Sequence, residues 1–305
     1  MQTVTFPSHG SRCEAWWVEA AVDDLTTAAG APCVVMAHGF GTTRDSGLLP
    51  FAERFAAVGC HVLVLDYRGF GGSEAPRGRP RQDVDHRRHR EDYHAAVAFA
   101  RARDDVDAAR IALWGTSYSG GHVVAVAAQD PSIAAVVSQG AAMDGLAVLT
   151  GKGRVRDPAT RDPAKARRVL RAVAADAVRA VTRRDPVMIP LLGEVGSGAL
   201  MSGPGAVEFT ALTGPSFRNE MCARGVARIA RNRPVRLAGN VRCPTLLVVA
   251  EHDEIAPPGV MLEVARRIGP AAEVASYDCA HFALYRGVGD SLDRQAAFLA
   301  RVLAP

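Results

Sequence analysis

The stretch that most constrains this chain is residues 115–120, with the sequence GTSYSG, between an apolar run (110–114) and a run of small residues (121–129). A strand, a tight turn around a serine and a helix together predict a nucleophile elbow with Ser117 at its tip. Such a turn strains the serine backbone and tolerates only small neighbours. Ser119 stands where a second glycine is usual, and serine is the next smallest residue that fits. The alternative is an ordinary glycine-rich turn, and these six residues alone do not decide between the two.

The rest of the chain alternates short apolar runs with helix-like segments, which predicts an α/β fold with a mostly parallel sheet and helices on both faces. Continuous apolar runs are typical of strands that are buried on both faces. The expected strands are residues 4–6 paired with 13–20, then 32–37, 60–65, 110–114, 133–138, 245–250 and 272–277. The expected helices are residues 46–58, 92–103, 121–129, 259–268 and 290–303.

This rhythm breaks in the middle of the chain. We expect residues 1–142 and 241–305 to form the α/β core, and residues 143–240 to form a helical insertion that lies over the strand ends as a cap. Such a length is too great for a structureless loop in a compact domain. Helical segments are expected at 164–184 and 217–231, on either side of a stretch rich in Pro and Gly. The alternative, a separate helical domain on the far side of the core, is less economical.

Composition excludes several classes of function. The chain has 305 residues, 48% of them hydrophobic and 22% charged, as in a globular protein with a substantial core. The net charge of +4 does not require a nucleic-acid partner. We see no signal peptide at the N-terminus and no apolar run long enough to cross a bilayer. The six scattered cysteines show no metal-binding spacing, so we expect free thiols, no metal and a cytoplasmic location.

A serine hydroxyl becomes a good nucleophile only when a neighbouring base, oriented by a third group, removes its proton. The candidate base is His281, which follows the last expected strand and therefore reaches the same sheet edge as Ser117. The favoured acid is Asp253, because it gives the chain order Ser, acid, His that is typical of this architecture. Glu254 and Asp144 remain alternatives for the acid, since one is adjacent and the other ends an earlier strand.

An acyl-transfer site also needs donors for the oxyanion of the tetrahedral intermediate. One candidate is the backbone N–H of Tyr118, directly after the serine and at a helix N-terminus. The second is the backbone N–H of Phe40, in the loop after an earlier strand. We interpret His38, which precedes this loop, as a structural residue that braces it. These assignments place two backbone donors beside Ser117.

Two further groups of residues invite a functional interpretation that we do not adopt. The glycines of residues 68–72 lack the lysine and the spacing of a phosphate-binding loop. His86, His89 and His94 lie in a charged, helix-forming stretch. There a solvated helix face is the simpler prediction than a metal site.

Taken together, these residues resemble the α/β-hydrolase superfamily. The matching segments are residues 38–40 (HGF), 66–73 (DYRGFGGS), 115–120 (GTSYSG), 252–257 (HDEIAP) and 281–282 (HF). Within the superfamily they are most similar to bacterial hydrolases of the acetyl-esterase and X-Pro-dipeptidyl-peptidase-like kind, whose relatives include fungal polyketide transferases. The resemblance implies an eight-stranded sheet, a Ser–Asp–His triad, an acyl-enzyme intermediate and no cofactor.

The predicted function is therefore a serine hydrolase that cleaves a carboxylic ester of a small molecule. This fold also hosts thioesterases, acyltransferases, peptidases and C–C bond hydrolases, so these remain alternatives. A ligand-binding protein that turns over nothing is a further alternative, which the complete triad disfavours. We leave open whether the chain forms a homo-oligomer. The insertion's arginines could favour an anionic substrate, but solvation of helix faces is the simpler interpretation; they are Arg167, Arg168, Arg171, Arg183 and Arg184.

Overall fold

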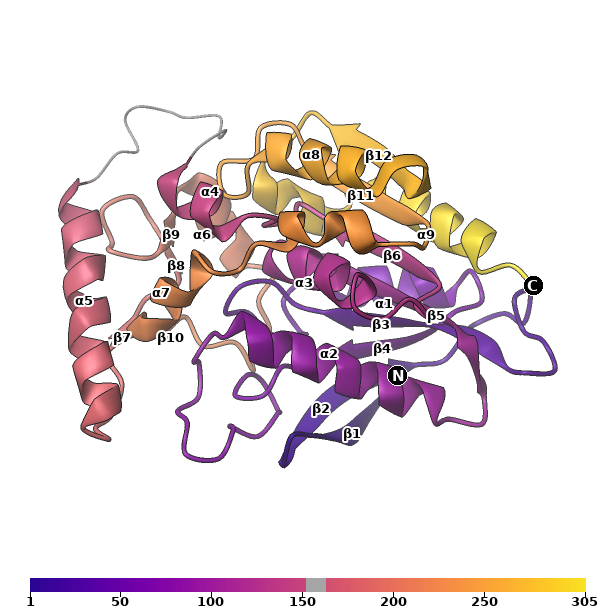
Figure 1. The fold of residues 1–305 in the computed structure, drawn as a ribbon, viewed down its shortest axis with the longest axis horizontal. Helices are drawn as coiled ribbons and strands as arrows, with labels where there is room; N and C mark the ends of the chain where they lie inside the picture. Colours follow the sequence, from indigo (N-terminus) through magenta and orange to yellow (C-terminus); the bar gives the residue numbers. More distant parts are fainter. Residues whose placement is uncertain (152–162) are drawn as a thin grey trace.

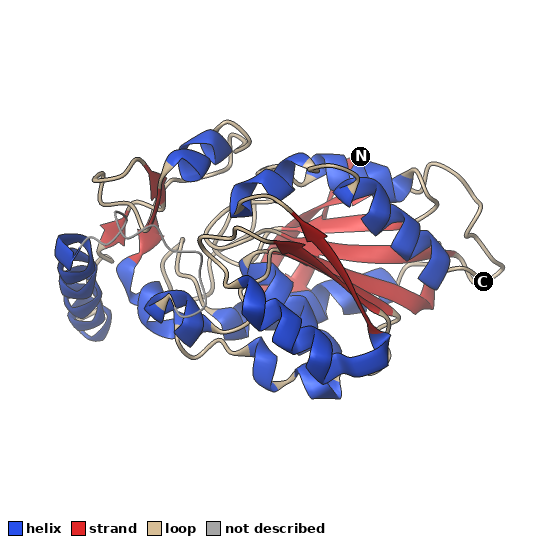
Figure 2. Ribbon diagram, turned by 90° about the horizontal axis from the view of Figure 1, so that it is seen from above, coloured by secondary structure: helices blue, strands red, loops and turns tan. Residues whose placement is uncertain are grey.

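An eight-stranded sheet forms the centre of the molecule (Figures 1 and 2). The computed structural model describes residues 1–151 and 163–305. The strand order is β1-β2-β4-β3-β5-β6-β11-β12, and all neighbours are parallel except the β1–β2 and β2–β4 pairs. The strands are β1 (Gln2–Ser8), β2 (Ser11–Val18), β3 (Ala31–Ala37), β4 (His61–Leu65), β5 (Val106–Thr116), β6 (Ala135–Gln139), β11 (Thr245–Ala250) and β12 (Ala272–Tyr277). The predicted fold class and sheet are confirmed.

Helices cover both faces of the sheet, as Figure 2 shows. They are α1 (Leu49–Ala56), α2 (His86–Arg101), α3 (Tyr118–Ala127), α8 (Pro258–Ile268) and α9 (Ser291–Val302). Helix α1 packs against α9, and α2 packs against α3. This double cover explains why every residue of β3 is buried and why its sequence is an unbroken apolar run.

Trp114 of β5, three residues before Ser117, lies in the core of the molecule. Its ring is fully buried and packs against the rings of Phe51 and Phe55 from α1. Its backbone carbonyl accepts a hydrogen bond from the hydroxyl of Tyr93, on α2, at 2.8 Å. Trp114 therefore joins helices from both faces to the strand that carries the serine.

The segment between β6 and β11 lies at one end of the sheet, with α5 at its outer margin (Figure 1). Its elements are α4 (Gly145–Thr150), α5 (Pro163–Val181), β7 (Met188–Ile189), β8 (Leu192–Gly193), β9 (Met201–Ser202), α6 (Pro204–Thr210), β10 (Met221–Cys222) and α7 (Val226–Ile229). The short strands form two separate two-stranded sheets. This segment is therefore less helical than predicted. Within it, residues 152–162 lie outside the described residues.

The helix predicted over residues 217–231 is wrong for its first half. There the chain forms a loop and the short strand β10, which pairs with β7. A 3₁₀ helix (Ala223–Gly225) and the four-residue α7 follow. The side chain of Asn219 accepts a hydrogen bond from the backbone N–H of Leu192 and donates one to its carbonyl, both at 2.8 Å. These contacts with distant residues outweigh the local helix propensity, which is a weak determinant.

The same segment contacts the loops at the carboxyl ends of the strands. The ring of Phe209, on α6, lies 5.1 Å from that of Phe282 and 4.6 Å from that of Tyr285, between centroids. Asp45, in the loop after β3, accepts hydrogen bonds from the backbone N–H and the hydroxyl of Ser216. The segment thus lies against the sheet edge where ligands bind in α/β folds.

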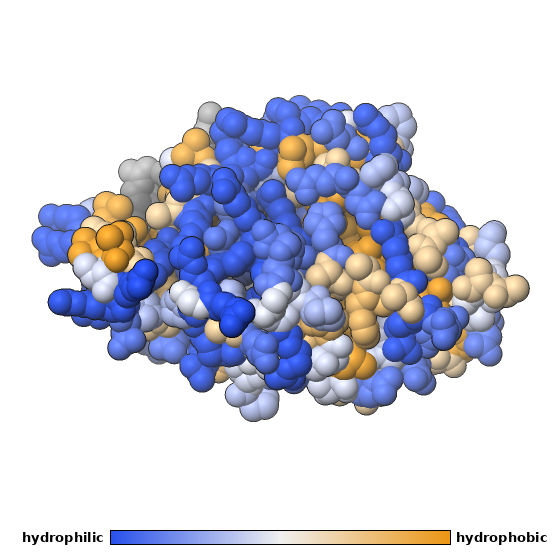
Figure 3. Space-filling view, turned by 60° about the horizontal axis from the view of Figure 1, so that its bottom comes forward, coloured by the Kyte–Doolittle hydropathy of each residue, from blue (hydrophilic) through white to orange (hydrophobic). Residues whose placement is uncertain are grey.

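Helix α5 packs on this segment through one side only. Its buried Asp176 forms an ion pair with Arg224, whereas Leu170, Val178 and Val181 are exposed. Figure 3 shows apolar side chains at the end of the molecule where α5 lies. The five arginines considered above are also exposed, as the solvation interpretation requires; they are Arg167, Arg168, Arg171, Arg183 and Arg184.

Two further sequence-based expectations can be checked against the fold. All six cysteines are buried and unpaired, so the prediction of free thiols is confirmed. Among residues 1–151 and 163–305, no helix has the length and apolar character needed to cross a bilayer.

Candidate active site

Ser117 lies at the junction of β5 and α3 in the strained conformation expected of an elbow. Its φ is 57° and its ψ is −116°, in a region that residues other than glycine rarely adopt. Such a conformation costs about 1–3 kcal/mol and persists where the surrounding structure enforces it. A Cβ atom at Gly115 would lie only 2.4 Å from the carbonyl oxygen of Ser119. The turn therefore requires the glycine, and the predicted elbow is present.

Ser119 contributes more to this turn than its small size. Its Oγ accepts a hydrogen bond from the backbone N–H of Thr116 at 2.8 Å and lies 2.8 Å from the carbonyl oxygen of Ala37, to which it can donate. The hydroxyl therefore ties the elbow to the end of β3. A second glycine at this position could not make these bonds.

His281 lies between Ser117 and Asp253. Its Nε2 is 3.0 Å from the Oγ of Ser117, and its Nδ1 is 2.6 Å from an oxygen of Asp253. The other carboxylate oxygen of Asp253 accepts hydrogen bonds from the backbone N–H groups of Ile255 and Ala256, at 2.8 and 2.6 Å. All three side chains are buried. Three residues distant in sequence therefore meet in the order hydroxyl, imidazole, carboxylate.

The two alternative acids have other partners. Glu254 accepts a hydrogen bond from the backbone N–H of His281 at 3.2 Å, so it contacts the backbone of that residue rather than its ring. Asp144 forms an ion pair with Arg233 at 2.6 Å and accepts hydrogen bonds from backbone N–H groups at the start of α4. Of the three carboxylates, Asp253 alone hydrogen-bonds the His281 ring.

The loop after β3 runs directly beside Ser117. A Cβ atom at Gly39 would lie 2.7 Å from the hydroxyl oxygen of Tyr285 and 3.2 Å from the Cβ of Ser117, so a side chain there would force its neighbours to move. The next residue, Phe40, packs its ring edge-on against that of Tyr118, with centroids 5.0 Å apart. The loop after β3 and the first residue of α3 are therefore in contact beside the serine.

His38 braces this loop, as predicted. Its Nδ1 lies 3.0 Å from the carbonyl oxygen of Gly39, and its Nε2 lies 3.5 Å from the backbone nitrogen of Tyr67. Burial lowers the pKa of His38 to about 4, so the ring is neutral at pH 7. A neutral imidazole can donate through Nδ1 and accept through Nε2, which matches both contacts.

The prediction that the histidines of α2 face solvent is wrong for two of them. His86 and His89 are buried, and only His94 is half-exposed. The ring of His89 stacks on that of Tyr67, with centroids 4.0 Å apart. The reason is helical spacing: His86 and His89 lie seven and four residues before Tyr93, which places them on the face that packs on the core. Within the described residues, no group of three or more metal-binding side chains has suitable geometry.

One residue of the site was missed altogether. Tyr285 lies four residues after His281 in the 3₁₀ helix His281–Arg286, and its hydroxyl reaches within 2.7 Å of the position that a Cβ of Gly39 would take. Burial raises the pKa of Tyr285 to about 12, and the neighbouring side chains of Thr116 and Ser117 lower it in part. The sequence carries no signal for it, because in a 3₁₀ helix residues three apart share a face, whereas Tyr285 is four residues from His281.

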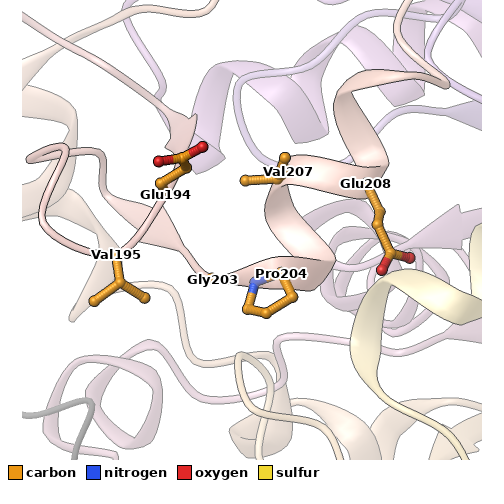
Figure 4. Close-up of a pocket in the computed structure, with 6 residues that line it drawn as sticks. All are labelled: Glu194, Val195, Gly203, Pro204, Val207 and Glu208. Carbon is orange, nitrogen blue, oxygen red and sulfur yellow. The ribbon is translucent and has the colours of Figure 1, made fainter.

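A separate pocket of about 510 Å³ lies on the segment between β6 and β11 (Figure 4). Two glutamates flank an apolar lining; its residues are Glu194, Val195, Gly203, Pro204, Val207 and Glu208. None of these lining residues is a serine, cysteine or histidine, and none of them belongs to the group formed by Ser117, His281 and Asp253.

Comparisons with known proteins agree with this fold. The quorum-quenching protein AidA of Acinetobacter baumannii is 36% identical, over 98% of this chain and 94% of its own length. The thiohydrolase aneE of Aspergillus aculeatus is 27% identical, over 90% and 87% of the two chains. The crystal structure of the alpha/beta hydrolase GrgF from Penicillium sp. sh18 has a TM-score of 0.79 at 23% identity and covers 99% of this chain and 98% of that one. The sequence profile of the alpha/beta hydrolase fold matches residues 32–288, so the chain belongs to the alpha/beta hydrolase fold family.

Proposed function

We propose that this protein is a serine hydrolase that cleaves carboxylic esters of small molecules through an acyl-enzyme intermediate. The observation that carries the proposal is the contact of His281 with both Ser117, at 3.0 Å, and Asp253, at 2.6 Å. A buried base within hydrogen-bond reach of a hydroxyl, and itself oriented by a carboxylate, is the arrangement that activates a serine.

In the proposed mechanism, the Oγ of Ser117 attacks the ester carbonyl while the Nε2 of His281 takes its proton. The oxyanion accepts hydrogen bonds from the backbone N–H groups of Phe40 and Tyr118. Asp253 holds the ring of His281 in the correct tautomer and stabilises its charged form. The intermediate then collapses, and His281 donates the proton to the departing alcohol. Water attacks the acyl-enzyme by the same route in reverse and releases the acid. No cofactor or metal takes part.

We further propose that residues 143–240 act as a cap on a core made of residues 1–142 and 241–305. The contacts of Phe209 with Phe282 and Tyr285 support this division, because they bring the segment against the residues that follow His281. Leu191, also from this segment, lies 2.9 Å from the position that a Cβ of Gly41 would take. A cap so placed would choose the substrate by the shape of the space above Ser117.

A second candidate function is the hydrolysis or transfer of a thioester-bound acyl group. The name of the thiohydrolase aneE favours it, as does that of the polyketide transferase grgF from Penicillium, which is 30% identical over 54% of this chain. The same acyl-enzyme would form, and the acceptor would be water or a second alcohol or thiol. Because the Acinetobacter relative is named for quorum quenching, small signalling molecules also belong among the substrates to be tested.

A substrate panel tests the proposal. With p-nitrophenyl esters of increasing acyl length, acyl thioesters and aminoacyl anilides at equal concentration, ester turnover is expected to exceed anilide turnover by about 100-fold or more. The reason is that an alcohol is a better leaving group than an amine when the tetrahedral intermediate collapses to the acyl-enzyme. The Ser117→Ala variant provides the blank for each substrate. Turnover of thioesters with none of the esters would favour the second candidate, and turnover of anilides alone would contradict both.

A further inference from the structure

We propose that Tyr285 is a positioning residue for Ser117, at the end of a buried chain of hydrogen bonds that starts at Trp114. The chain passes through Gln295, Gln139 and Thr116. Its effect is to point the proton of Ser117 toward His281. This inference rests on the proposed function, in which Ser117 is the nucleophile.

The first three links have a fixed direction. The indole Nε1 of Trp114 donates to the Oε1 of Gln295 at 2.7 Å, the Nε2 of Gln295 donates to the Oε1 of Gln139 at 2.9 Å, and the Nε2 of Gln139 donates to the Oγ1 of Thr116 at 3.2 Å. Because an indole N–H can only donate, it sets the orientation of the first amide, which then sets that of the second. All four residues are buried, so water does not compete for these groups.

The last links run from Thr116 through Tyr285 to Ser117. The hydroxyl of Tyr285 lies beside both residues, and in this proposal it accepts a hydrogen bond from Thr116 and donates one to Ser117. Tyr285 and Ser117 both lie next to Gly39. A Cβ atom on this glycine would be 2.7 Å from the hydroxyl oxygen of Tyr285 and 3.2 Å from the Cβ of Ser117. The phenol and the nucleophile therefore adjoin the same glycine. The ring of Tyr285 is held by that of Phe209, 4.6 Å away between centroids.

The direction of the chain determines what Tyr285 does. A hydroxyl has one proton to donate and two lone pairs that accept. Thr116 accepts from Gln139, so its proton is free for the oxygen of Tyr285. The proton of Tyr285 is then free for the Oγ of Ser117. Because Ser117 accepts from Tyr285, its own proton points to the Nε2 of His281, which is the direction that proton transfer to the base requires. Hydrogen bonds in such a chain also strengthen one another.

Covalent labelling of Ser117 measures this effect without a known natural substrate. We would compare the second-order rate constant for reaction with a fluorophosphonate between the unmodified protein, Tyr285→Phe, Thr116→Val and the double variant. Each single substitution is expected to lower the rate constant about three- to tenfold, the effect of one lost hydrogen bond. The double variant is expected to be no slower than Tyr285→Phe, because both substitutions break the same chain. The pH at half-maximal rate should stay unchanged, since the His281–Asp253 pair is intact.

Tyr277→Phe is the matched control, because its hydroxyl bonds Asp290 at 2.9 Å, outside the chain. It should label at the unmodified rate, and circular dichroism with thermal unfolding would verify that every variant folds. If Tyr285→Phe and Thr116→Val both label as fast as the unmodified protein, or if their effects multiply, the positioning role is wrong while the proposed function stands. If the unmodified protein is not labelled at Ser117, the proposed function fails and this inference fails with it.

Discussion

Replacing Ser117 with alanine is expected to lower kcat/KM for a p-nitrophenyl ester by about 10³-fold or more, while the protein stays folded. The substitution removes the atom that would form the acyl-enzyme, and the residual rate would come from the oxyanion donors and from binding alone. Steady-state kinetics with purified protein measure the effect. Activity close to that of the unmodified protein would show that Ser117 is not the nucleophile.

Two matched aspartate variants test which carboxylate orients His281. Asp253→Asn keeps the shape of the side chain but removes the charge beside His281, so kcat/KM is expected to fall by roughly 10³- to 10⁴-fold. Asp144→Asn should leave it within about threefold, because Asp144 pairs with Arg233 and caps α4. If Asp144→Asn lowers kcat/KM and Asp253→Asn does not, Asp144 rather than Asp253 is the acid of the triad.

Acidification from pH 6.5 toward 4 is expected to unfold the protein. Burial lowers the pKa of His38 from 6.5 to about 4, and burial also lowers the pKa values of His89 and His122. Below pH 6.5 these histidines bind protons in the unfolded chain but not in the folded one. Protonation therefore favours unfolding, and stability falls as the pH falls. For His38 alone the loss is about 3 kcal/mol by pH 4.

The total loss is comparable with the stability of an ordinary domain, roughly 5–15 kcal/mol. The buried Asp66 opposes it in part: burial raises the pKa of its carboxyl to about 6, so the folded state takes up that proton first and gains stability. Urea unfolding at a series of pH values measures the net change in the free energy of unfolding. His122→Phe, which keeps a ring and removes the titration, should unfold at lower pH, whereas His94→Gln, half-exposed on α2, should not shift the transition. Stability that is constant from pH 6.5 to 4 would contradict the prediction.

Much of the fold was predictable because its determinants are local. Strands buried on both faces read as unbroken apolar runs, and β3 shows this directly. The elbow was predictable for the same reason, since the backbone of Ser117 tolerates only small neighbours. Residues 217–222 were not, because the loop and short strand there depend on the pairing of β10 with β7 and on the contacts of Asn219 with Leu192. Such pairing leaves little trace in the local sequence.

The candidate site was predictable in its members but not in its supporting contacts. Strand order brought Ser117 and His281 to one edge, yet Asp253 and Asp144 both follow strands. The structure separates them, because Asp253 contacts the His281 ring and Asp144 pairs with Arg233. The buried His86 and His89 were misjudged because charged neighbours outweighed their spacing along the helix. Tyr285 could not be identified at all, since its place beside Gly39 depends on the 3₁₀ helix that starts at His281.

The most direct test is a crystal structure of the protein after reaction with an alkyl fluorophosphonate, whose adduct mimics the tetrahedral intermediate. We expect phosphorus to be bonded to the Oγ of Ser117. The phosphoryl oxygen should lie about 2.7–3.1 Å from the backbone nitrogens of Phe40 and Tyr118. An adduct on any other residue, or a phosphoryl oxygen turned away from both nitrogens, would contradict the account.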